Sequence, residues 1–384
     1  MSPQAPVSRG GLNMRHPHAS MHSSETQSGF SLIEILVGLV ISLLVTLVIM
    51  QVFSVFEGQK RSTTGTADAQ TNGNIALYNV QRDVQLAGYG LPVFAKTDSP
   101  LLCTTFTPSG TNLSPITITD GGNAAGASDS VTVRYGSTPL GGVPVVIASA
   151  PSPATSPMEV TVQNNMGCAV GDTALITSST SCILVEGSGA DGGLLVPTAP
   201  SSTTVIKLRV GTGVATGASI ACLGSWKTYV YSVNNANQLE RSSTINGVIS
   251  TSPNVAEIVN IQAQYGVSAT ANNNQVVQWV DATGATWGPT ITPANRNRIK
   301  AVRIAIVARN GLLEKEDITT ACSSITNANP TGLCAWDATS ANPTIASPAP
   351  TIDLSSITDW QKYRYRVFET IIPIRSMIWS KDTL

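Results

Sequence analysis

One long apolar run near the start of the chain dominates its pattern of hydrophobic and polar positions. Residues 35 to 56 form 22 consecutive residues without a charge, and a helix needs about 20 apolar residues to cross the hydrocarbon core of a bilayer. A single carboxylate, Glu34, stands just before this run. A carboxylate inside lipid costs on the order of 2.5–3.5 kcal/mol, so Glu34 requires a partner there. The pattern therefore predicts a membrane-spanning helix that carries one carboxylate with a specific contact to make.

The helical pattern continues beyond the apolar run as an amphipathic stripe. Most positions from 70 to 87 are polar, but apolar residues recur at the three- and four-residue spacing of one helix face. These apolar residues are Leu77, Val80, Val84 and Ala87. Gly88, Gly90 and Pro92 end the pattern. We therefore expect the second half of the helix to pack against a globular domain.

Three glycines interrupt the predicted helix from residue 30 to residue 87. They are Gly58, Gly65 and Gly73. Because each glycine costs about 1 kcal/mol relative to alanine inside a helix, we predict bends or melted turns at these positions.

After Pro92 the pattern changes to short runs of β-branched residues. Clusters of Gly, Pro, Ser and Asn separate the runs, which is typical of strands joined by turns. The predicted strands lie at 131–135, 145–147, 160–162, 174–176, 183–185, 205–210, 302–306 and 365–374. The run at 302–306 alternates like a half-buried strand, and Pro373 is predicted to lie on a sheet edge. Residues 229–233 and 238–241 are predicted to pair as a hairpin around an Asn-rich turn, whereas 255–265 fits either a helix or a strand.

These elements predict an α+β fold, in which a long N-terminal helix packs on an antiparallel β-rich domain. The 384 residues suit one large domain or two small ones. The predicted parts are a leader (1–29), a transmembrane or assembly helix (30–56), its amphipathic continuation (57–92), and two β-rich regions (93–220 and 221–384). We predict the region 93–220 to be an insertion.

The composition argues against a catalytic or nucleic-acid-binding protein. All three histidines, His16, His18 and His22, lie in the predicted leader, so the remaining chain lacks the base of Ser-His and Cys-His nucleophile systems. No phosphate-binding or dinucleotide-binding glycine motif is present. Beyond the leader, 20 basic and 22 acidic residues remain, too few cations for a nucleic-acid footprint. We predict no catalytic residue and no enzyme activity.

Six cysteines follow the apolar run: Cys103, Cys168, Cys182, Cys222, Cys322 and Cys334. An even number on one side of a membrane favours disulfides in an oxidising compartment. The short spacings favour Cys168–Cys182 and Cys322–Cys334, which leaves Cys103 for Cys222. Buried free thiols are an alternative. A zinc site is disfavoured, because the chain has no CxxC motif and no histidine after the leader.

Two loops carry many side-chain oxygens, the residue type that binds calcium. They are residues 120–129 and 272–274. Neither has the ligand spacing of an EF-hand, so surface loops are favoured over a calcium site, and we predict no metal site and no cofactor.

The residues around the start of the apolar run resemble a known processing site. The segment Gly29-Phe30-Ser31-Leu32-Ile33-Glu34, followed by an uncharged run, is similar to the N-terminus of type IV prepilins. Residues 79–90, with an Arg-Asp pair before Ala-Gly-Tyr, resemble the end of the long helix in minor pilins of the PilW type. Residues 298–309 and 363–375 resemble that group's C-terminal strands.

This resemblance implies a specific set of sites and partners. In the prepilin family a membrane aspartyl peptidase cleaves after the glycine and methylates the new N-terminus, which implies cleavage after Gly29 and methylation of Phe30. Glu34 then becomes the fifth residue and the assembly contact. The implied protein is a minor pilin that crosses the inner membrane once, has its bulk in the periplasm and enters a pilus near its tip. The implied partners are other minor pilins, the major pilin, the prepilin peptidase and a pilus tip protein, with no nucleic acid.

Two rival functions stay open on the sequence. One is a J-type pseudopilin of type II secretion, and the other is a membrane-anchored adhesin or binding module. For Arg82 and Asp83, two solvated charges and a structural contact to the sheet are both open, and we expect no close pair between these adjacent helical residues.

Overall fold

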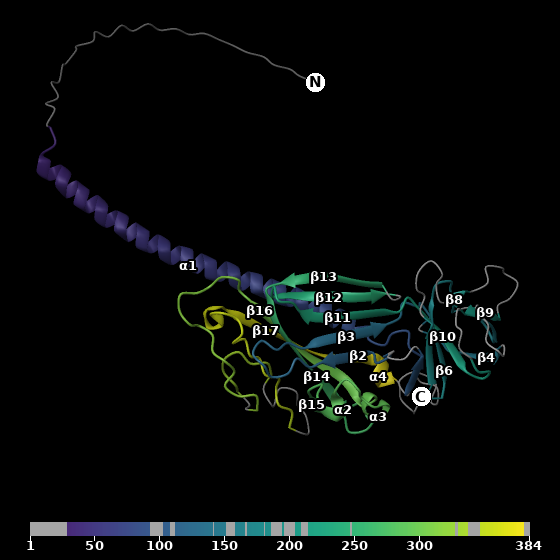
Figure 1. The fold of residues 1–384 in the computed structure, drawn as a ribbon. Coiled ribbons are helices and arrows are strands. Elements are labelled where there is room, and N and C mark those ends of the chain that lie inside the picture. Colours follow the sequence, from purple (N-terminus) through teal and green to yellow (C-terminus); the bar gives the residue numbers. More distant parts are fainter. Residues whose placement is uncertain are drawn as a thin grey trace, which may run out of the picture. The chain divides into compact units, whose positions relative to one another are not determined.

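The computed structural model describes residues 29–92, 103–107, 112–140, 142–150, 158–165, 167–179, 181–185, 194–195, 204–208, 214–245, 248–326, 329–336 and 346–379. The predicted leader up to residue 28, with its three histidines, lies outside these residues, as does the end of the strand predicted at 205–210. The chain divides into two compact units at residues 59 and 60. Figure 1 shows the long helix α1 and the β-rich remainder.

The predicted long helix is confirmed as α1, Leu32–Gln85. The melted turns predicted at Gly58, Gly65 and Gly73 are absent, because α1 continues as one helix through all three positions. A Cβ atom added to Gly65 would collide with the side chain of Asn310, and one added to Gly73 would collide with the ring of Phe368. These two glycines therefore let the helix approach the sheet closely. The helix ends where Gly88 takes a positive φ of 76° and donates its N–H to Arg134 O at 2.7 Å.

Two antiparallel sheets lie against the second half of α1. The five-stranded sheet has the order β13 (Val248–Ala256), β12 (Gln238–Ile245), β11 (Lys227–Val233), β3 (Ser130–Tyr135) and β2 (Ile116–Thr119). The four-stranded sheet has the order β15 (Val276–Val280), β14 (Ile258–Ser268), β16 (Ile299–Arg309) and β17 (Tyr365–Pro373). Together they confirm the antiparallel β-rich domain.

The strands of these two sheets agree with most of the local predictions and contradict one. The hairpin is confirmed as β11 and β12, whose turn holds Asn237 at a positive φ of 56°. The ambiguous segment 255–265 is almost entirely strand, divided between β13 and β14. Pro373 ends the edge strand β17, as predicted. The half-buried reading of 302–306 is wrong, because these residues of β16 are buried on both faces.

The remaining strands form an eight-stranded sheet. Its order is β1 (Thr105–Thr107), β7 (Ser181–Val185), β6 (Thr173–Ser178), β10 (Ser219–Gly224), β4 (Val145–Ser149), β5 (Met158–Val162), β9 (Val205–Leu208) and β8 (Leu194–Leu195). All pairs are antiparallel except β1 with β7. The predicted division at residue 220 falls inside β10, and β3 from the first region pairs with β11 from the second. Strand pairing thus crosses that division.

One hydrophobic core joins α1 to both smaller sheets. Val80 and Val84 of the predicted stripe are fully buried, whereas Leu77 is only partly buried. They pack with residues of β3, β11, β14 and β16, including Val133, Tyr231 and Ile304. Short helical segments complete the chain. They are α2 (Gly284–Trp287), α3 (Pro293–Arg296), the 3₁₀ turn η3 (Trp360–Lys362) and α4 (Arg375–Trp379).

Candidate functional site

The predicted processing segment lies at the very start of α1. Gly29 has open space around it, with no atom within 4 Å of an added Cβ. Phe30 is 80% exposed. The helix begins when Ser31 O accepts hydrogen bonds from the N–H groups of Glu34, at 2.9 Å, and Ile35, at 3.2 Å. Gly29 and Phe30 therefore stay outside the helix, where the backbone is accessible.

Glu34 lies in the first turn of α1, where the helix dipole favours a carboxylate. Its side chain is exposed, and no described residue pairs with it. It lies four positions after Phe30 in the sequence. The carboxylate is thus available to another molecule.

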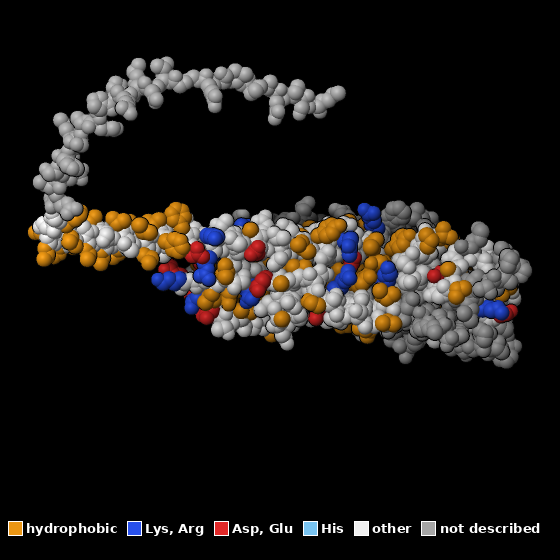
Figure 2. Space-filling view, turned by 90° about the horizontal axis from the view of Figure 1, so that it is seen from above, with side chains coloured by type: hydrophobic (Ala, Val, Ile, Leu, Met, Phe, Trp, Pro, Cys, Tyr) orange, Lys and Arg blue, Asp and Glu red, His pale blue; other side chains and the backbone are white. Residues whose placement is uncertain are grey.

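The first half of α1 presents an apolar surface on all sides. Among the described residues, α1 alone is long and apolar enough to cross a membrane. Figure 2 shows hydrophobic side chains along the visible face of this stretch. Its hydroxyl groups are satisfied within the helix, because Ser42 Oγ donates to Leu39 O at 2.9 Å and Thr46 Oγ1 donates to Ser42 O at 2.7 Å. The stretch can therefore enter lipid without an unpaired hydroxyl.

A buried carboxylate joins the second half of α1 to the five-stranded sheet. Asp83 is 1% exposed. Tyr231 Oη of β11 donates a hydrogen bond to Asp83 Oδ2 at 2.6 Å, and Arg241 of β12 lies 3.8 Å from the same oxygen. The guanidinium of Arg241 also stacks over the ring of Tyr229 at 4.9 Å. The structural contact to the sheet, one of the two readings left open, is therefore correct for Asp83.

Arg82 contradicts the expectation that these neighbours stay apart. Its Nη2 lies 3.3 Å from Asp83 Oδ1, while its side chain remains 49% exposed. The long guanidinium arm reaches sideways around the helix, which the direction of the Cα–Cβ bonds alone does not predict. Asp83 raises the pKa of Arg82, and burial, together with the hydrogen bond to Asp83, raises the pKa of Tyr231. Both shifts keep the partners of Asp83 protonated.

A second buried polar group lies on the opposite face of the four-stranded sheet. Arg303 of β16 is fully buried between Trp279 and Trp336, whose ring centres lie 5.2 and 4.7 Å from the guanidinium carbon. Its Nε donates to Gln264 Oε1 at 2.6 Å, and its Nη2 donates to Pro348 O at 3.0 Å. Burial lowers the pKa of Arg303 to about 10. This residue type in a strand is normally solvated, so sequence reasoning missed it.

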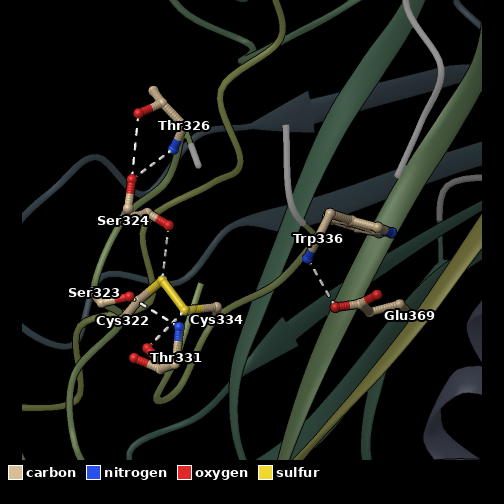
Figure 3. The surroundings of a disulfide bond; sticks show 8 residues. All are labelled: Cys322, Ser323, Ser324, Thr326, Thr331, Cys334, Trp336 and Glu369. Atoms are coloured by element: carbon tan, nitrogen blue, oxygen red, sulfur yellow. Dashed lines mark hydrogen bonds between the residues drawn. A yellow bond between two sulfur atoms is a disulfide. The ribbon is translucent and has the colours of Figure 1, made fainter. Parts of the chain in front are cut away.

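The segment that covers Arg303 is held by the disulfide Cys322–Cys334, shown in Figure 3. Beside it, Trp336 has a left-handed φ of 34°, and its N–H donates to Glu369 Oε1 of β17 at 2.9 Å. Trp336, Leu333 and neighbouring residues pack on Val307 in a separate hydrophobic cluster. The loop thus closes the outer face of β16, which explains why this strand is buried on both sides.

The other cysteines pair differently from the prediction. Cys103 pairs with Cys182, and Cys168 pairs with Cys222, so the predicted bonds Cys168–Cys182 and Cys103–Cys222 are wrong. Cys322–Cys334 agrees with the prediction. The short spacing between Cys168 and Cys182 did not predict the pairs, because pairing follows the order of the strands. Cys182 lies on β7, which is next to β1, whereas Cys222 lies on β10, on the other side of β6.

The oxygen-rich loop at 120–129 uses the carboxylate of its last residue for internal hydrogen bonds. Asp129 is 4% exposed and accepts hydrogen bonds from Gly121 N at 2.9 Å and Ala263 N at 2.8 Å. Burial raises the pKa of Asp129 to about 6, although both hydrogen bonds oppose the rise. Within the part of the chain that the structure describes, no three acidic, histidine or cysteine residues gather as a metal site would require.

The comparisons with known proteins point to pili. No curated protein matches the chain. A type IV-like pilin from Thermus thermophilus is similar over 80% of this chain and 96% of its own, with 10% identity and a TM-score of 0.31. Residues 229–376, less than half of the chain, match the family model of Type IV Pilus-assembly protein W. This region begins in β11 and includes Tyr231 and Arg241, so the matched part contains the sheet partners of Asp83. The chain is therefore similar to a pilus-related family.

Proposed function

We propose that this protein is a minor pilin of the PilW type, needed to start or to cap a type IV pilus together with other minor pilins. The observation that carries the proposal is the family match over residues 229–376 in a chain that also has an exposed apolar helix near its N-terminus. A structural role, without catalysis, agrees with both features.

Processing at the N-terminus belongs to the same proposal. The prepilin peptidase cleaves after Gly29 and methylates the amine of Phe30. The exposed Gly-Phe bond ahead of α1 supports access by a membrane enzyme. Cleavage also creates a positive amine at Phe30, four residues before Glu34.

Glu34 then serves as the assembly contact. At membrane depth the local dielectric is low, so the amine of one subunit and the carboxylate of its neighbour attract each other strongly. The pair lets a subunit leave the inner membrane without an uncompensated charge. The bulk of the protein resides in the periplasm before assembly, and a domain of this size suits the tip better than a repeating position along the fibre.

Deleting the gene in the producing cell tests this function. We expect loss of surface pili, restored by the wild-type chain, and co-purification of the tagged chain with other minor pilins. Mass spectrometry should find a methylated N-terminal Phe30. Intact pili with failed protein secretion would instead assign the chain to a type II secretion system, and intact pili with lost surface binding would indicate an adhesin. An intact Met1 in the membrane fraction would refute processing.

A further inference from the structure

Three of the four edge strands of the two smaller sheets are closed or carry charges. In β2, Ile118 N donates a hydrogen bond to Tyr265 Oη at 2.6 Å. In β15, Trp279 N donates to Ser347 Oγ at 2.9 Å. The edge strand β17 carries charged residues and Pro373. Natural sheets protect their edges in these ways, because an open edge can pair with another chain.

The fourth edge strand, β13, presents an open and uncharged edge. Figure 1 shows it as the outermost strand of the five-stranded sheet. None of the residues in Val248–Ala256 is charged. Among the described residues, no backbone hydrogen bond from outside β12 reaches this strand. The side chains of Val248 and Ile249 are 68% and 72% exposed. The edge is therefore open to pairing, and its chemistry suits an uncharged segment.

Two features show which backbone groups of β13 point away from the sheet. Ser250 O accepts a hydrogen bond from Ser243 Oγ of β12 at 3.2 Å, so this carbonyl faces β12. Pro253 has no N–H, and a proline in an edge strand has its nitrogen on the open side. The pairing with β12 is regular over this stretch. Because backbone directions alternate along a strand, Ile249 and Thr251 direct their N–H and C=O groups outward.

The direction of β13 argues against pairing between two copies of this chain. Asn79 Nδ2 of α1 donates a hydrogen bond to Asn254 Oδ1 of β13 at 2.8 Å. One helical turn later, Asp83 lies 3.8 Å from Arg241, which pairs with Ser252 of β13. β13 therefore runs antiparallel to α1. Copies held in one membrane by parallel α1 helices would have parallel β13 strands, so they could not form the antiparallel pair that would extend this sheet.

We propose that β13 binds an uncharged extended segment of a different pilus subunit, which adds to the five-stranded sheet as one more strand. Backbone hydrogen bonds to Ile249 and Thr251 supply the affinity, as in other cases of strand addition. The exposed side chains of Val248 and Ile249 favour β-branched or other apolar residues on the partner strand. This inference rests on the proposed function for the presence of other pilus subunits beside the chain.

Photo-cross-linking in the producing cell tests this pairing. The tagged full-length chain carries benzoylphenylalanine at position 248, and mass spectrometry identifies the cross-linked peptides. We expect one dominant product, which joins β13 to an uncharged segment of a second subunit that has its own N-terminal apolar helix. Benzoylphenylalanine in place of Val170, which is 58% exposed before β6, should not give this product. Cross-links only to a second copy of this chain, or only to proteins without such a helix, would overturn the proposal.

Substitutions at the edge separate strand pairing from other contacts. Thr251→Pro removes an outward N–H and keeps the bonds to β12, so the yield of the cross-link should fall about tenfold, the factor for about 1.4 kcal/mol. Ile249→Lys places a charge at the edge on a side chain that is already exposed, and it should have the same effect even if Thr251→Pro folds poorly. Thr244→Lys adds the same charge on β12, opposite Ile249. It should change the yield by less than about twofold, because it lies one strand inside the edge.

The pattern across these variants decides the mode of binding. An equal loss with Thr244→Lys would show that the partner binds the face of the sheet, and it would overturn pairing at the edge. An unchanged cross-link in both edge variants would overturn the pairing as well. Intact pili after deletion of the gene, together with a cross-link that both edge variants remove, would refute the proposed function and support the strand pairing.

Discussion

Tyr231 donates a hydrogen bond of 2.6 Å to the buried carboxylate of Asp83. The bond joins the last turns of α1 to the middle of the five-stranded sheet. Asp83 receives further compensation from Arg82 and Arg241 on either side. A carboxylate in the core is thus retained at the helix end, where it fixes the rotation of α1 against β11.

Removing the Tyr231 hydroxyl should destabilise this junction. A hydrogen bond to a charged group contributes about 1.5–3 kcal/mol, so Tyr231→Phe should lower the free energy of unfolding by about 2 kcal/mol. Tyr78→Phe is the matched control, because Tyr78 is 63% exposed on the same helix. Thermal unfolding of the full chain in detergent, followed by circular dichroism, measures both. Equal melting temperatures for the two variants would contradict a stabilising role of the bond.

The glycines of α1 should respond to alanine in opposite ways. Gly73→Ala places a methyl group against the ring of Phe368, so it should destabilise the fold even though alanine favours helices. Gly58→Ala meets nothing within 4 Å and should leave stability unchanged or raise it by up to about 1 kcal/mol. Denaturant unfolding in detergent distinguishes the two. A stabilising effect at both positions would show that the close helix–sheet contact is unimportant.

The glycines also show which part of the buried face of α1 can be predicted from the sequence. Periodicity predicted the apolar stripe from Leu77 onward, and Val80, Val84 and Ala87 of that stripe are buried. It did not identify Gly65, Ala69 and Gly73 as the continuation of that face, because small residues carry little hydrophobic signal. Gly65 and Gly73 were interpreted as breaks, yet they are the positions of closest approach to Asn310 and Phe368.

The same limit applies to contacts between segments that are distant in sequence. The alternation at 302–306 correctly predicted a strand, but it indicated a half-buried one and so did not predict the burial of Arg303. Only the covering segment around Trp336, held by its own disulfide, buries the face that carries Arg303. The two wrong cysteine pairs have the same origin, because the order of strands in a sheet is not encoded in sequence spacing.

The disulfide pairing can be checked directly by peptide mapping. Digestion without reduction should give one peptide pair linking Cys103 to Cys182 and another linking Cys168 to Cys222. These bonds close long loops, with sequence separations of 79 and 54, so each should stabilise the fold by about 4 kcal/mol on the chain-entropy model. The double variant Cys168→Ala, Cys222→Ala should therefore unfold at a much lower denaturant concentration. A Cys168–Cys182 peptide would contradict the strand order of the eight-stranded sheet.

Glu34 should matter for assembly and not for folding. Its side chain is exposed and pairs with no described residue, so Glu34→Ala should leave the melting temperature and the N-terminal mass after processing unchanged. Co-purification with other minor pilins should fall at least fivefold, because the partner amine would enter the assembly unpaired. Glu57→Ala, which removes an exposed carboxylate just beyond the apolar run, is the control. Normal co-purification of Glu34→Ala with other minor pilins would refute the proposed contact.

Asp129 makes the stability of the β-rich unit depend on pH. Its pKa is about 6 in the folded chain, against 3.8 as the ordinary value, so the folded state holds the extra proton more tightly between these limits. The contribution of Asp129 to the free energy of unfolding is therefore fully present below about pH 3.8, and it is lost as the pH rises through about 6. Each unit of pKa difference corresponds to about 1.4 kcal/mol.

We therefore expect the melting temperature to rise when the pH is lowered from 7.5 to 5, and Asp129→Asn to flatten this rise. The substitution also removes one acceptor for the N–H groups of Gly121 and Ala263, so the variant should be less stable at pH 5, where the wild type keeps both bonds. Asp353→Asn is the control, because hydrogen bonds from Ser355 lower the pKa of Asp353. If the melting temperature of Asp129→Asn depends on pH as steeply as that of the wild type, the dependence comes from other groups. Asp281 and Asp172 are examples, because burial also raises their pKa values.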